Sequence, residues 1–474
     1  MGMAKHSAFA ASAPPTAPER ESTARLLLRA WVIVVLAMGL GYSGVYNLVG
    51  ATGTLVVLTV VTAVTLAIWI PAIVQSHPVP LGWRRFPWVA LGYLALALVS
   101  VLWSAWPSAT LVTWALLASM TVHAIFIAHV LTWREFFHAL ASALKWLLAL
   151  SVAIELWVAV VLRHPIFPNF FTPPGAEIDP HWYWVQGQLF TDERIQGIVG
   201  NANLLAPLCL MAIIVFGVLF FARVRWRATL ALWALLAVYL LIRAGSATIY
   251  VATAVCAFTL VIALVMRQRT GRGERTAVYA VALGTAAVII TLGILFRHEV
   301  LDLMDRNSTL TGRRELWEET LNLAHEHLWF GWGFSSPWVP VAPEMAEWLD
   351  EVQILTFHAH SMWIDPLFQL GIVGVTLMGL VYFMATWRTW FFAVDRPRWD
   401  LRADRPFSPL TLAPSLIVIM LLVQGFTESA PIMMWGWMLV VLFSYKIKVV
   451  PLIGVGLSER THVTEHGKTP RRVP

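Results

Sequence analysis

The chain has 474 residues and a formal net charge of +6; 58% of its residues are hydrophobic and only 13% are charged. With a mean hydropathy of +0.70, this composition excludes an ordinary soluble domain and indicates a polytopic membrane protein surrounded by the lipid bilayer. The positive charge does not indicate a nucleic-acid partner, because arginine and lysine in the loops of such a chain mainly set its topology. The two cysteines, Cys209 and Cys256, lie within hydrophobic runs and form neither a disulfide framework nor a metal-binding spacing.

The chain divides into two polar tails and a long hydrophobic region. Residues 1–24 are rich in alanine, proline and serine, which predicts a disordered cytoplasmic tail rather than a signal peptide; residues 451–474 form the second cytoplasmic tail. Between them, residues 25–450 are predicted to form an all-α domain of twelve transmembrane helices, because apolar runs of spanning length recur along it. The runs lie at about residues 27–48, 53–74, 88–105, 109–131, 140–162, 203–222, 228–242, 248–266, 277–296, 362–386, 409–428 and 431–449.

Clusters of basic residues predict the orientation of these spans. If the N-terminus is cytoplasmic, the clusters at residues 84–85, 223–227, 267–275 and 388–405 all fall on the cytoplasmic side, as the positive-inside rule requires. One span more or fewer between two of these clusters would break the pattern. We therefore predict a multi-pass protein of the cytoplasmic (inner) membrane with both termini in the cytoplasm.

The opposite, extracytoplasmic face keeps two substantial loops, residues 163–202 and a large helical loop at 297–361, together with a polar break at 243–246. Arginine on this face goes against the topological bias, so arginines that are set in local polar patterns there indicate a bound anion. These arginines are Arg194, Arg243, Arg313 and Arg314.

The stretch from Arg194 to Asn203 is one such pattern, directly before a predicted span. Gly197 and Gly200 give it a flexible backbone that can leave N–H groups pointing at a ligand. An arginine next to free N–H groups suits a phosphate, and we therefore expect this stretch to contact an anionic ligand.

A second pattern is a predicted helix in the large loop. Thr311 is the expected N-cap, and the helix is predicted to run to about Leu328. Arg313 and Arg314 would then lie in its first turn, where free N–H groups and the helix dipole already favour anions. Adjacent arginines add bidentate phosphate recognition, so a diphosphate would suit this arrangement.

The third pattern is the segment HSMWIDPLFQLGIVG, which opens the predicted span at 362–386 with His360 and Ser361. Gly371 and Gly374 lie one turn apart within it and predict a stripe of small residues where a neighbouring helix approaches closely. Asp365 is an acid inside the span, which makes it either a functional group or the polar partner of a helix kink.

Together these patterns resemble the O-antigen ligase (WaaL) and O-antigen polymerase-type superfamily. The resemblance rests on four features in this order: the arginine stretch before Asn203, the Gly-Arg…Trp helix at 312–317, the Gly-Trp-Gly turn at 331–333, and the His-Ser-x9-Gly-x-x-Gly segment that begins at His360. The motifs cover about residues 190–375, and the predicted topology covers the whole chain.

The resemblance implies a fold similar to that of GT-C glycosyltransferases and a metal-independent reaction that uses no cofactor. Members of this superfamily move a glycan from an undecaprenyl-diphosphate carrier to a glycan, lipid or protein acceptor outside the cytoplasmic membrane. By this resemblance Arg194 and Arg313 engage the diphosphate and His360 acts near the acceptor, so these three are the candidate catalytic residues. Arg243 matches the family's arginine at the corresponding polar break, although Ile242 precedes it where a serine is expected. The candidate substrate-binding residues are Arg243, Arg314, Asn203, Ser361, Asp365 and Glu428.

The expected chemistry is a single displacement with inversion at the anomeric carbon. Arginines that gather the negative charge of the departing diphosphate would lower the barrier without a metal. His360 is either the general base or only a group that orients the acceptor by hydrogen bonding, since imidazole side chains titrate near neutral pH. Glu428 is an alternative base. The sequence leaves open whether the acceptor is a different molecule, as for a ligase, or a second carrier-linked glycan, as for a Wzy-type polymerase.

Two readings from other classes compete with this one. A zinc site at 325–327 or at 358–360 is disfavoured, because residues two apart do not share a helix face. A proton-coupled transporter would use buried charges such as Lys145 and Glu155, which lie about 15 Å apart along one helix and so do not pair with each other. Against a transporter, the two halves of the chain show no repeat and no matching pair of broken spans.

Overall fold

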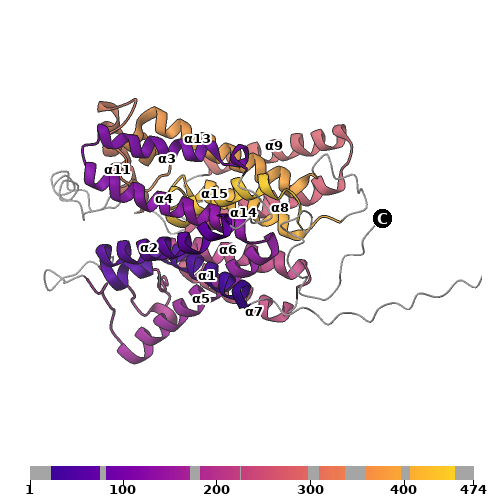
Figure 1. Cartoon of the computed structure of the whole chain (residues 1–474). Helices are drawn as coiled ribbons and strands as arrows, with labels where there is room; N and C mark the ends of the chain where they lie inside the picture. Colours follow the sequence, from indigo (N-terminus) through magenta and orange to yellow (C-terminus); the bar gives the residue numbers. More distant parts are fainter. Residues whose placement is uncertain are drawn as a thin grey trace, which may run out of the picture.

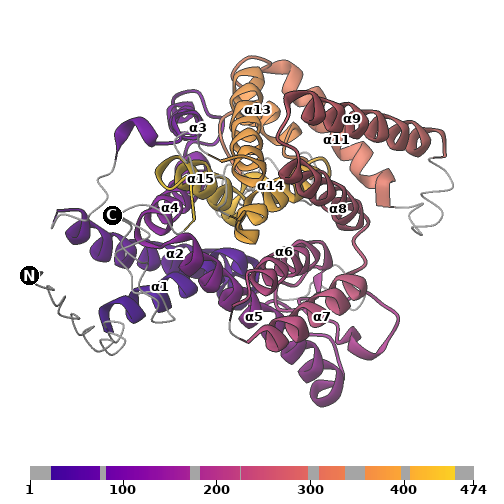
Figure 2. The ribbon, with the colours of Figure 1, turned by 90° about the vertical axis from the view of Figure 1, so that its right-hand side faces the viewer.

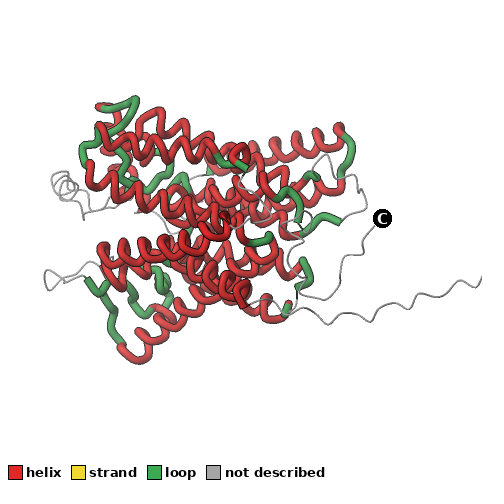
Figure 3. The backbone as a smooth tube through the Cα atoms, viewed as in Figure 1, coloured by secondary structure: helices red, strands yellow, loops and turns green. Residues whose placement is uncertain are grey.

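The computed structural model describes residues 23–74, 82–170, 182–224, 226–296, 309–336, 358–396 and 406–453. Most of both predicted tails and parts of the large loop, residues 297–308 and 337–357, lie outside the described residues. Helices make up the regular structure of the part that is described, where the only β-pairing is an isolated bridge between Ile166 and Val185 (Figure 3). The predicted all-α class is confirmed.

Nine helices in this part of the chain are long and apolar enough to cross a membrane, and two shorter apolar helices accompany them. The protein is therefore an all-helical polytopic membrane protein with nine to eleven candidate transmembrane helices among the described residues (Figure 1). The nine are α1 (Thr23–Leu40), α2 (Tyr42–Val74), α4 (Pro107–Val130), α5 (Trp133–Leu156) with the π-helical turn η3 (Trp157–Leu162), α6 (Ala202–Phe221), α7 (Arg227–Ala244), α8 (Ala247–Gln268), α9 (Arg272–Leu295) and α13 (Ile364–Val394). The two shorter ones are α3 (Trp88–Val99) and α14 (Leu412–Gln424).

A further apolar helix, α15 (Met434–Val449), occupies the last of the twelve predicted runs. It lies in the middle of the bundle (Figure 2), and nearly all of its 16 side chains are buried. Inside the bundle the Lys446 ammonium donates to the carbonyl of Ala128, and Trp437 Nε1 donates to Thr121 Oγ1. By contrast α9 lies at the outer edge against α8 and has no buried residue. An apolar helix that is exposed all round matches a lipid-facing position.

Two of the long helices are interrupted by a glycine with positive φ. In α2 the break is at Gly50, with φ +71°, which agrees with the predicted boundary between the first two apolar runs. In α13 it is at Gly371, with φ +64°. The predicted stripe of small residues is therefore wrong at Gly371, because this glycine breaks the helix instead of lying on a helical face.

The break in α13 pairs with the Gly-Trp-Gly turn that follows α11 (Thr309–Glu326). A Cβ atom on Gly371 would collide with the backbone of Trp329, and one on Gly331 would collide with the backbone of Gln369. The close approach allows four backbone hydrogen bonds. The N–H groups of Trp332 and Gly333 donate to the carbonyls of Phe368 (3.1 Å) and Gln369 (2.9 Å), and those of Ile372 and Val373 donate to the carbonyls of Leu328 (2.9 Å) and Trp329 (3.3 Å). These bonds dock the end of α11 on α13. The helix α11 itself begins two residues before Thr311, so the predicted N-cap position is wrong.

Candidate active site

The short segment that precedes α13 holds His360 in a fixed position. The N–H of Ala359 donates to Asp365 Oδ1 (3.1 Å), and its carbonyl accepts from Trp317 Nε1 (2.8 Å). The N–H of His360 donates to His358 Nδ1 (3.2 Å). His360 has φ +50°, a left-handed conformation that is costly for a residue with a side chain and that concentrates at functional sites. Asp365 therefore acts on His360 through the backbone, and the kink in α13 lies at Gly371 rather than beside Asp365.

The same segment is bound to the connection between α14 and α15. The N–H of Ser361 donates to Ser429 Oγ (3.1 Å), and the N–H of Met362 donates to the carbonyl of Gly425 (2.9 Å). Ser361 is 3% exposed, and its Oγ accepts from the N–H of Trp363 (3.3 Å). Ser361 thus fixes the start of α13 and has little surface to offer a substrate.

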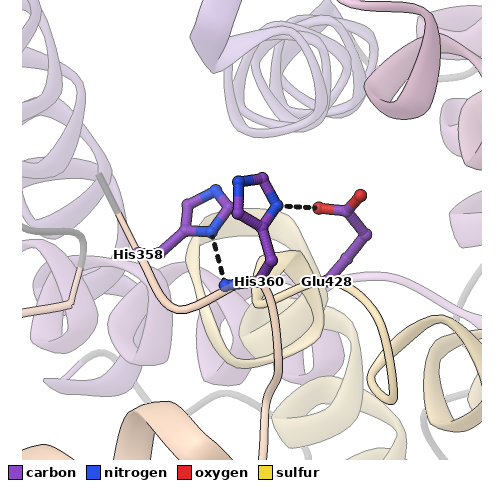
Figure 4. A group of neighbouring side chains, drawn as sticks. All are labelled: His358, His360 and Glu428. Atoms are coloured by element: carbon purple, nitrogen blue, oxygen red, sulfur yellow. Dashed lines mark hydrogen bonds and ion pairs between the residues drawn. The ribbon is translucent and has the colours of Figure 1, made fainter. Parts of the chain in front are cut away.

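Glu428, which lies in this connection, joins two of the three predicted catalytic residues. Its Oε1 accepts from the Arg313 guanidinium at 2.6 Å, and its Oε2 lies 3.2 Å from His360 Nδ1 (Figure 4). The Glu428 side chain is 8% exposed, whereas those of Arg313 and His360 are 21% and 28% exposed. A ligand would therefore reach the arginine and the histidine, with the carboxylate behind them.

The charges decide the protonation of this network. Burial raises the pKa of the Glu428 carboxyl, but the hydrogen bond and charge of His360 and the charge of Arg313 outweigh burial and hold its pKa below the usual range. An ionised carboxylate only accepts hydrogen bonds. In the contact between Glu428 and His360 the proton therefore lies on Nδ1. Burial also lowers the pKa of His358 to about 3, which keeps that imidazole neutral and able to accept from the N–H of His360.

Arg194, the third predicted catalytic residue, is held at the start of α6 and the end of α7. Its Nε donates to the carbonyl of Ala244 (2.8 Å), and one of its terminal nitrogens donates to Asn203 Oδ1 (2.7 Å). Gly245 packs on the Arg194 side chain, because a Cβ there would lie 3.5 Å from Arg194 Cγ. Asn203 therefore orients Arg194, and its direct contact with substrate stays a prediction.

Arg243 is hydrogen-bonded to the loop that carries Arg194, residues 188–197, which we call the Arg194 loop. Its guanidinium donates to the backbone carbonyls of Gln188 (2.8 Å), Thr191 and Glu193 (3.0 Å). Its own carbonyl accepts from the N–H of Ile195 (3.1 Å). One terminal nitrogen of Arg243 is thus shared among three carbonyls, and the structure gives this arginine a positioning role beside its predicted role in binding.

The N–H groups of the same loop bind a carboxylate of the protein itself. Glu155, at the end of α5, is 1% exposed; its Oε1 accepts from the N–H groups of Gln196 and Gly197 (both 2.9 Å), and its Oε2 from that of Gln188 (3.1 Å). The prediction that these N–H groups point at a ligand is wrong, because Glu155 already occupies them. Sequence reasoning missed this role, although an acid within an apolar span was a visible signal.

The start of α8 connects the Arg194 loop to Glu428. Gly245, which packs on Arg194, lies two residues before α8, and Thr248 in its first turn shares a 2.7 Å hydroxyl hydrogen bond with Thr427. Thr427 directly precedes Glu428. The three predicted catalytic residues therefore lie at the same end of the bundle, around the first turn of α8.

Comparison with known proteins gives a family for this part of the chain. Residues 232–379 match the O-antigen ligase family (Wzy_C). The chain carries an O-antigen ligase family domain. The chain is also distantly similar to the exopolysaccharide production protein ExoQ of Rhizobium meliloti (strain 1021), with 22% identity over 319 residues that cover 66% of this chain and 68% of that protein.

The O-antigen ligase family domain contains some of the residues described above and leaves others outside. Arg243, Arg313 and His360 lie within it, whereas Arg194 and Glu428 lie before and after the matched residues. Arg314 lies within it too, but its side chain is 80% exposed and pairs with Glu318 along α11. The structure therefore does not bring Arg314 to the network around Glu428.

The network at the end of the O-antigen ligase family domain also has the spacing of a metal site. Ligand atoms of His358, His360 and Glu428 lie within 4.8 Å of one another. The helix-face argument against such a site does not apply here, because residues 358–361 are not helical. A different argument disfavours a cation: the Arg313 guanidinium already bonds to Glu428, so a metal ion would lie beside a fixed positive charge.

Proposed function

We propose that this protein is a membrane glycosyltransferase that moves a glycan from an undecaprenyl-diphosphate carrier to an acceptor on the extracytoplasmic face, as an O-antigen ligase-type enzyme. The observation that carries the proposal is the buried Glu428 carboxylate, which holds Arg313 and His360 together beside a matched O-antigen ligase family domain. The Arg313 guanidinium suits the phosphate of a donor, and the His360 imidazole suits the hydroxyl of an acceptor. Donor and acceptor are the two reacting partners of such a transfer.

The donor diphosphate would lie between Arg313 and Arg194. Both arginines are held by carboxylate, amide or carbonyl oxygens, so their guanidinium groups need little reorganisation when the leaving group gains charge. Preorganised cations that face the developing charge lower the barrier for its departure. Guanidinium groups also match phosphate oxygens in a bidentate manner.

The acceptor hydroxyl would lie at His360 Nε2. In the neutral form of His360 that acts as a base, Glu428 keeps the single ring proton on Nδ1, which leaves Nε2 free to take the hydroxyl proton. The acceptor oxygen then forms a bond to the anomeric carbon while the bond from that carbon to the diphosphate oxygen breaks. One displacement inverts the configuration at the anomeric carbon, and the diphosphate leaves on its isoprenoid carrier. Glu428 serves this step better as the partner of His360 than as the base, because its lowered pKa makes it a weak proton acceptor.

We place this site on the extracytoplasmic side of a twelve-span, GT-C-like bundle in the cytoplasmic membrane, with both termini in the cytoplasm. The position of α15 at the twelfth predicted run supports this topology. The basic clusters at the opposite ends of the helices support the orientation.

A Wzy-type polymerase is the second candidate, because the same donor site would serve it and the distant relative is an exopolysaccharide production protein. The acceptor then is a second carrier-linked glycan instead of a different envelope polymer. The transporter reading loses one of its arguments, since the buried charge of Glu155 is accounted for by its bonds to backbone N–H groups.

The test uses purified protein in detergent with EDTA, a lipid-diphosphate-linked glycan, and either a crude envelope fraction or more donor as acceptor. Release of undecaprenyl diphosphate is measured for the wild type, for Arg313→Ala and His360→Ala, and for Arg314→Ala as the matched control on the same helix. We expect release by the wild type and the control only; the acceptor that supports it separates ligase from polymerase. Absence of transfer, with substrate-dependent proton flux in liposomes, would refute the proposal in favour of a transporter.

A further inference from the structure

A polar cavity of about 440 Å³ lies between α5, α6 and α7, at the ends of these helices away from Arg194. The three helices pack against one another and lie together in the bundle (Figures 1 and 2). Basic side chains from two of the walls line the cavity, and no acidic residue does. The lining residues that carry the argument are Arg134, His138, Ser142, Lys145, Arg223 and Trp226.

The α5 wall of this cavity is a polar stripe on a helix of membrane-spanning length. Arg134, His138, Ser142 and Lys145 follow one another at intervals of four, four and three residues, so they share one face of α5. The stripe runs about 16 Å along the helix, at 1.5 Å per residue. Within the stripe Ser142 Oγ donates to the His138 carbonyl (3.0 Å), but the charges of Arg134 and Lys145 need a polar partner, because lipid tails offer none.

Lys145 is the most informative member of the stripe. It is half-buried on the inner part of α5, and its Nζ lies 6.0 Å from the centre of the Phe216 ring. Ionisable side chains inside membrane spans are rare, and they mark functional sites by default. A contact with an aromatic ring at the edge of the cation–π range compensates only part of the cost of burying the charge.

The three cations of the cavity lack a counter-charge among the described residues. Arg134, Lys145 and Arg223 form no ion pair within that part of the chain. Arg223 directly follows the C-cap of α6 and has φ +57°, the left-handed conformation with which many helices end. At the mouth of the cavity Trp226 is 69% exposed, a position typical of the membrane–water interface.

We propose that this cavity binds a phosphate group, either the headgroup of an anionic phospholipid or free inorganic phosphate. The arginines at the mouth offer bidentate hydrogen bonds to phosphate oxygens, and Lys145 offers a point charge deeper in the cavity. Basic pockets between transmembrane helices on the cytoplasmic side suit lipid headgroups. The bound phosphate would tie α5, which carries Glu155 at its other end, to the connection between α6 and α7 that holds Arg223.

The test compares the thermal unfolding of the delipidated full-length protein in three additives. These are phosphatidylglycerol in mixed micelles, phosphatidylcholine in mixed micelles, and inorganic phosphate at matched ionic strength. We expect phosphatidylglycerol to raise the Tm of the wild type above its value in phosphatidylcholine by at least about 2 °C. Lys145→Gln and Arg223→Gln should lose this gain, and native mass spectrometry should find phosphatidylglycerol on the wild type but not on these variants.

Arg272→Gln is the matched control, because Arg272 is exposed at the start of α9 on the same side of the bundle and does not line the cavity. If Lys145→Gln fails to fold, Arg223→Gln alone decides whether the rise in Tm depends on the cavity. Lys145→Arg, which keeps the charge, should keep the rise in Tm. A gain from inorganic phosphate that the same variants lose would support the site with free phosphate as its ligand. The proposal is overturned if no additive separates the wild type from the variants, or if all variants gain equally.

Discussion

The charge on Glu428 is what makes Arg313 and His360 one unit. Both partners bond to the same carboxylate, so its replacement should affect the position of the arginine and the tautomer of the imidazole together. In the proposed transfer Arg313 would bind a phosphate and His360 a hydroxyl, and their shared bonds to Glu428 would hold the two groups at a fixed separation.

Glu428→Gln tests this coupling, because it keeps the shape of the side chain and removes the charge. We expect the turnover number to fall by about 10²-fold or more, the usual contribution of a positioned acid or base, while donor binding weakens less. Steady-state kinetics with the lipid-linked donor measure both effects. Glu318→Gln, which removes the other glutamate that pairs with an arginine of α11, is the control and should leave turnover unchanged. Full activity of Glu428→Gln would contradict the coupling.

The lowered pKa of His358 makes a prediction about stability and pH. Its folded pKa is about 3 and an unfolded histidine titrates near 6.5, so between these values only the unfolded state binds the proton. Stability is therefore full above about pH 6.5 and declines as the pH falls towards 3, with a loss of about 1 kcal/mol from pH 7.5 to 5.5.

His358→Asn tests that loss, since the amide oxygen can still accept from the N–H of His360 and does not titrate. The free energy of local opening at residues 359–362, measured by backbone hydrogen exchange, should depend less on pH between 7.5 and 5.5 in the variant than in the wild type. An unchanged pH dependence in the variant would place the titrating group elsewhere.

At the scale of single residues, the structure tests which candidates lie together but not what they do in a reaction. Arg194, Arg313, His360 and Glu428 were all named from the sequence, and the structure places them at one end of the bundle. The pairing of Arg313 with Glu428 could not be predicted, because 115 residues separate them and only the packing of α11, α13 and α14 brings them together. Ser361 shows the same limit, since its buried hydrogen bonds are invisible in a motif.

At the scale of elements, the break in α13 and the turn after α11 form one joint. An apolar run predicts a span but carries no sign of an interruption within it. The sequence therefore predicts a continuous helical face where the structure has the break at Gly371. The joint itself depends on the turn at 331–333, whose contact with α13 is tertiary. Glycine is required at 331 and 371, because a Cβ on Gly371 would collide with the backbone of Trp329 and one on Gly331 with the backbone of Gln369.

Gly371→Ala should therefore destabilise the protein by at least about 2 kcal/mol, because alanine adds a left-handed backbone penalty and a steric clash. Gly379→Ala is a control on the same helix, where the new Cβ would meet only the Trp363 ring at 3.9 Å. Thermal unfolding in detergent compares the two. Equal Tm values would show that α13 can straighten without loss, which would contradict the joint.

Two side chains form hydrogen bonds to the backbone of the Arg194 loop. Glu155 accepts from its N–H groups, and Arg243 donates to its carbonyls. Glu155→Gln removes the charge and places an amide N–H against backbone donors. The loop should therefore become less ordered, and the guanidinium of Arg194 should no longer be held in one position. We expect donor affinity to fall about tenfold, as for other supporting contacts, with a smaller change in turnover. Glu193→Gln, an exposed change in the same loop, should keep donor affinity. A fall in turnover alone would assign Glu155 a different role.

At the scale of the whole molecule, the predicted topology puts opposite chemistry at the two ends of the bundle. The network around Glu428 and the Arg194 loop lie at one end, and the cationic cavity between α5 and α7 lies at the other. The predicted apolar runs fall on helices, because length and hydrophobicity are properties of the run alone, but the first run, 27–48, extends from α1 into the start of α2. The orientation is still a prediction, since it rests on the distribution of basic residues rather than on packing.

Cysteine labelling tests the orientation, because the two native cysteines are buried and should give little background. Glu193→Cys would place a thiol on the Arg194 loop, and Arg272→Cys would place one at the start of α9, at the opposite end; both native side chains are exposed. A membrane-impermeant thiol reagent should label the first in intact cells and the second only after the membrane is opened. Labelling of both thiols from outside would mean that the number of spans between them is wrong. The reverse pattern would place the proposed transfer site in the cytoplasm, where a carrier-linked glycan is built and not transferred to its final acceptor.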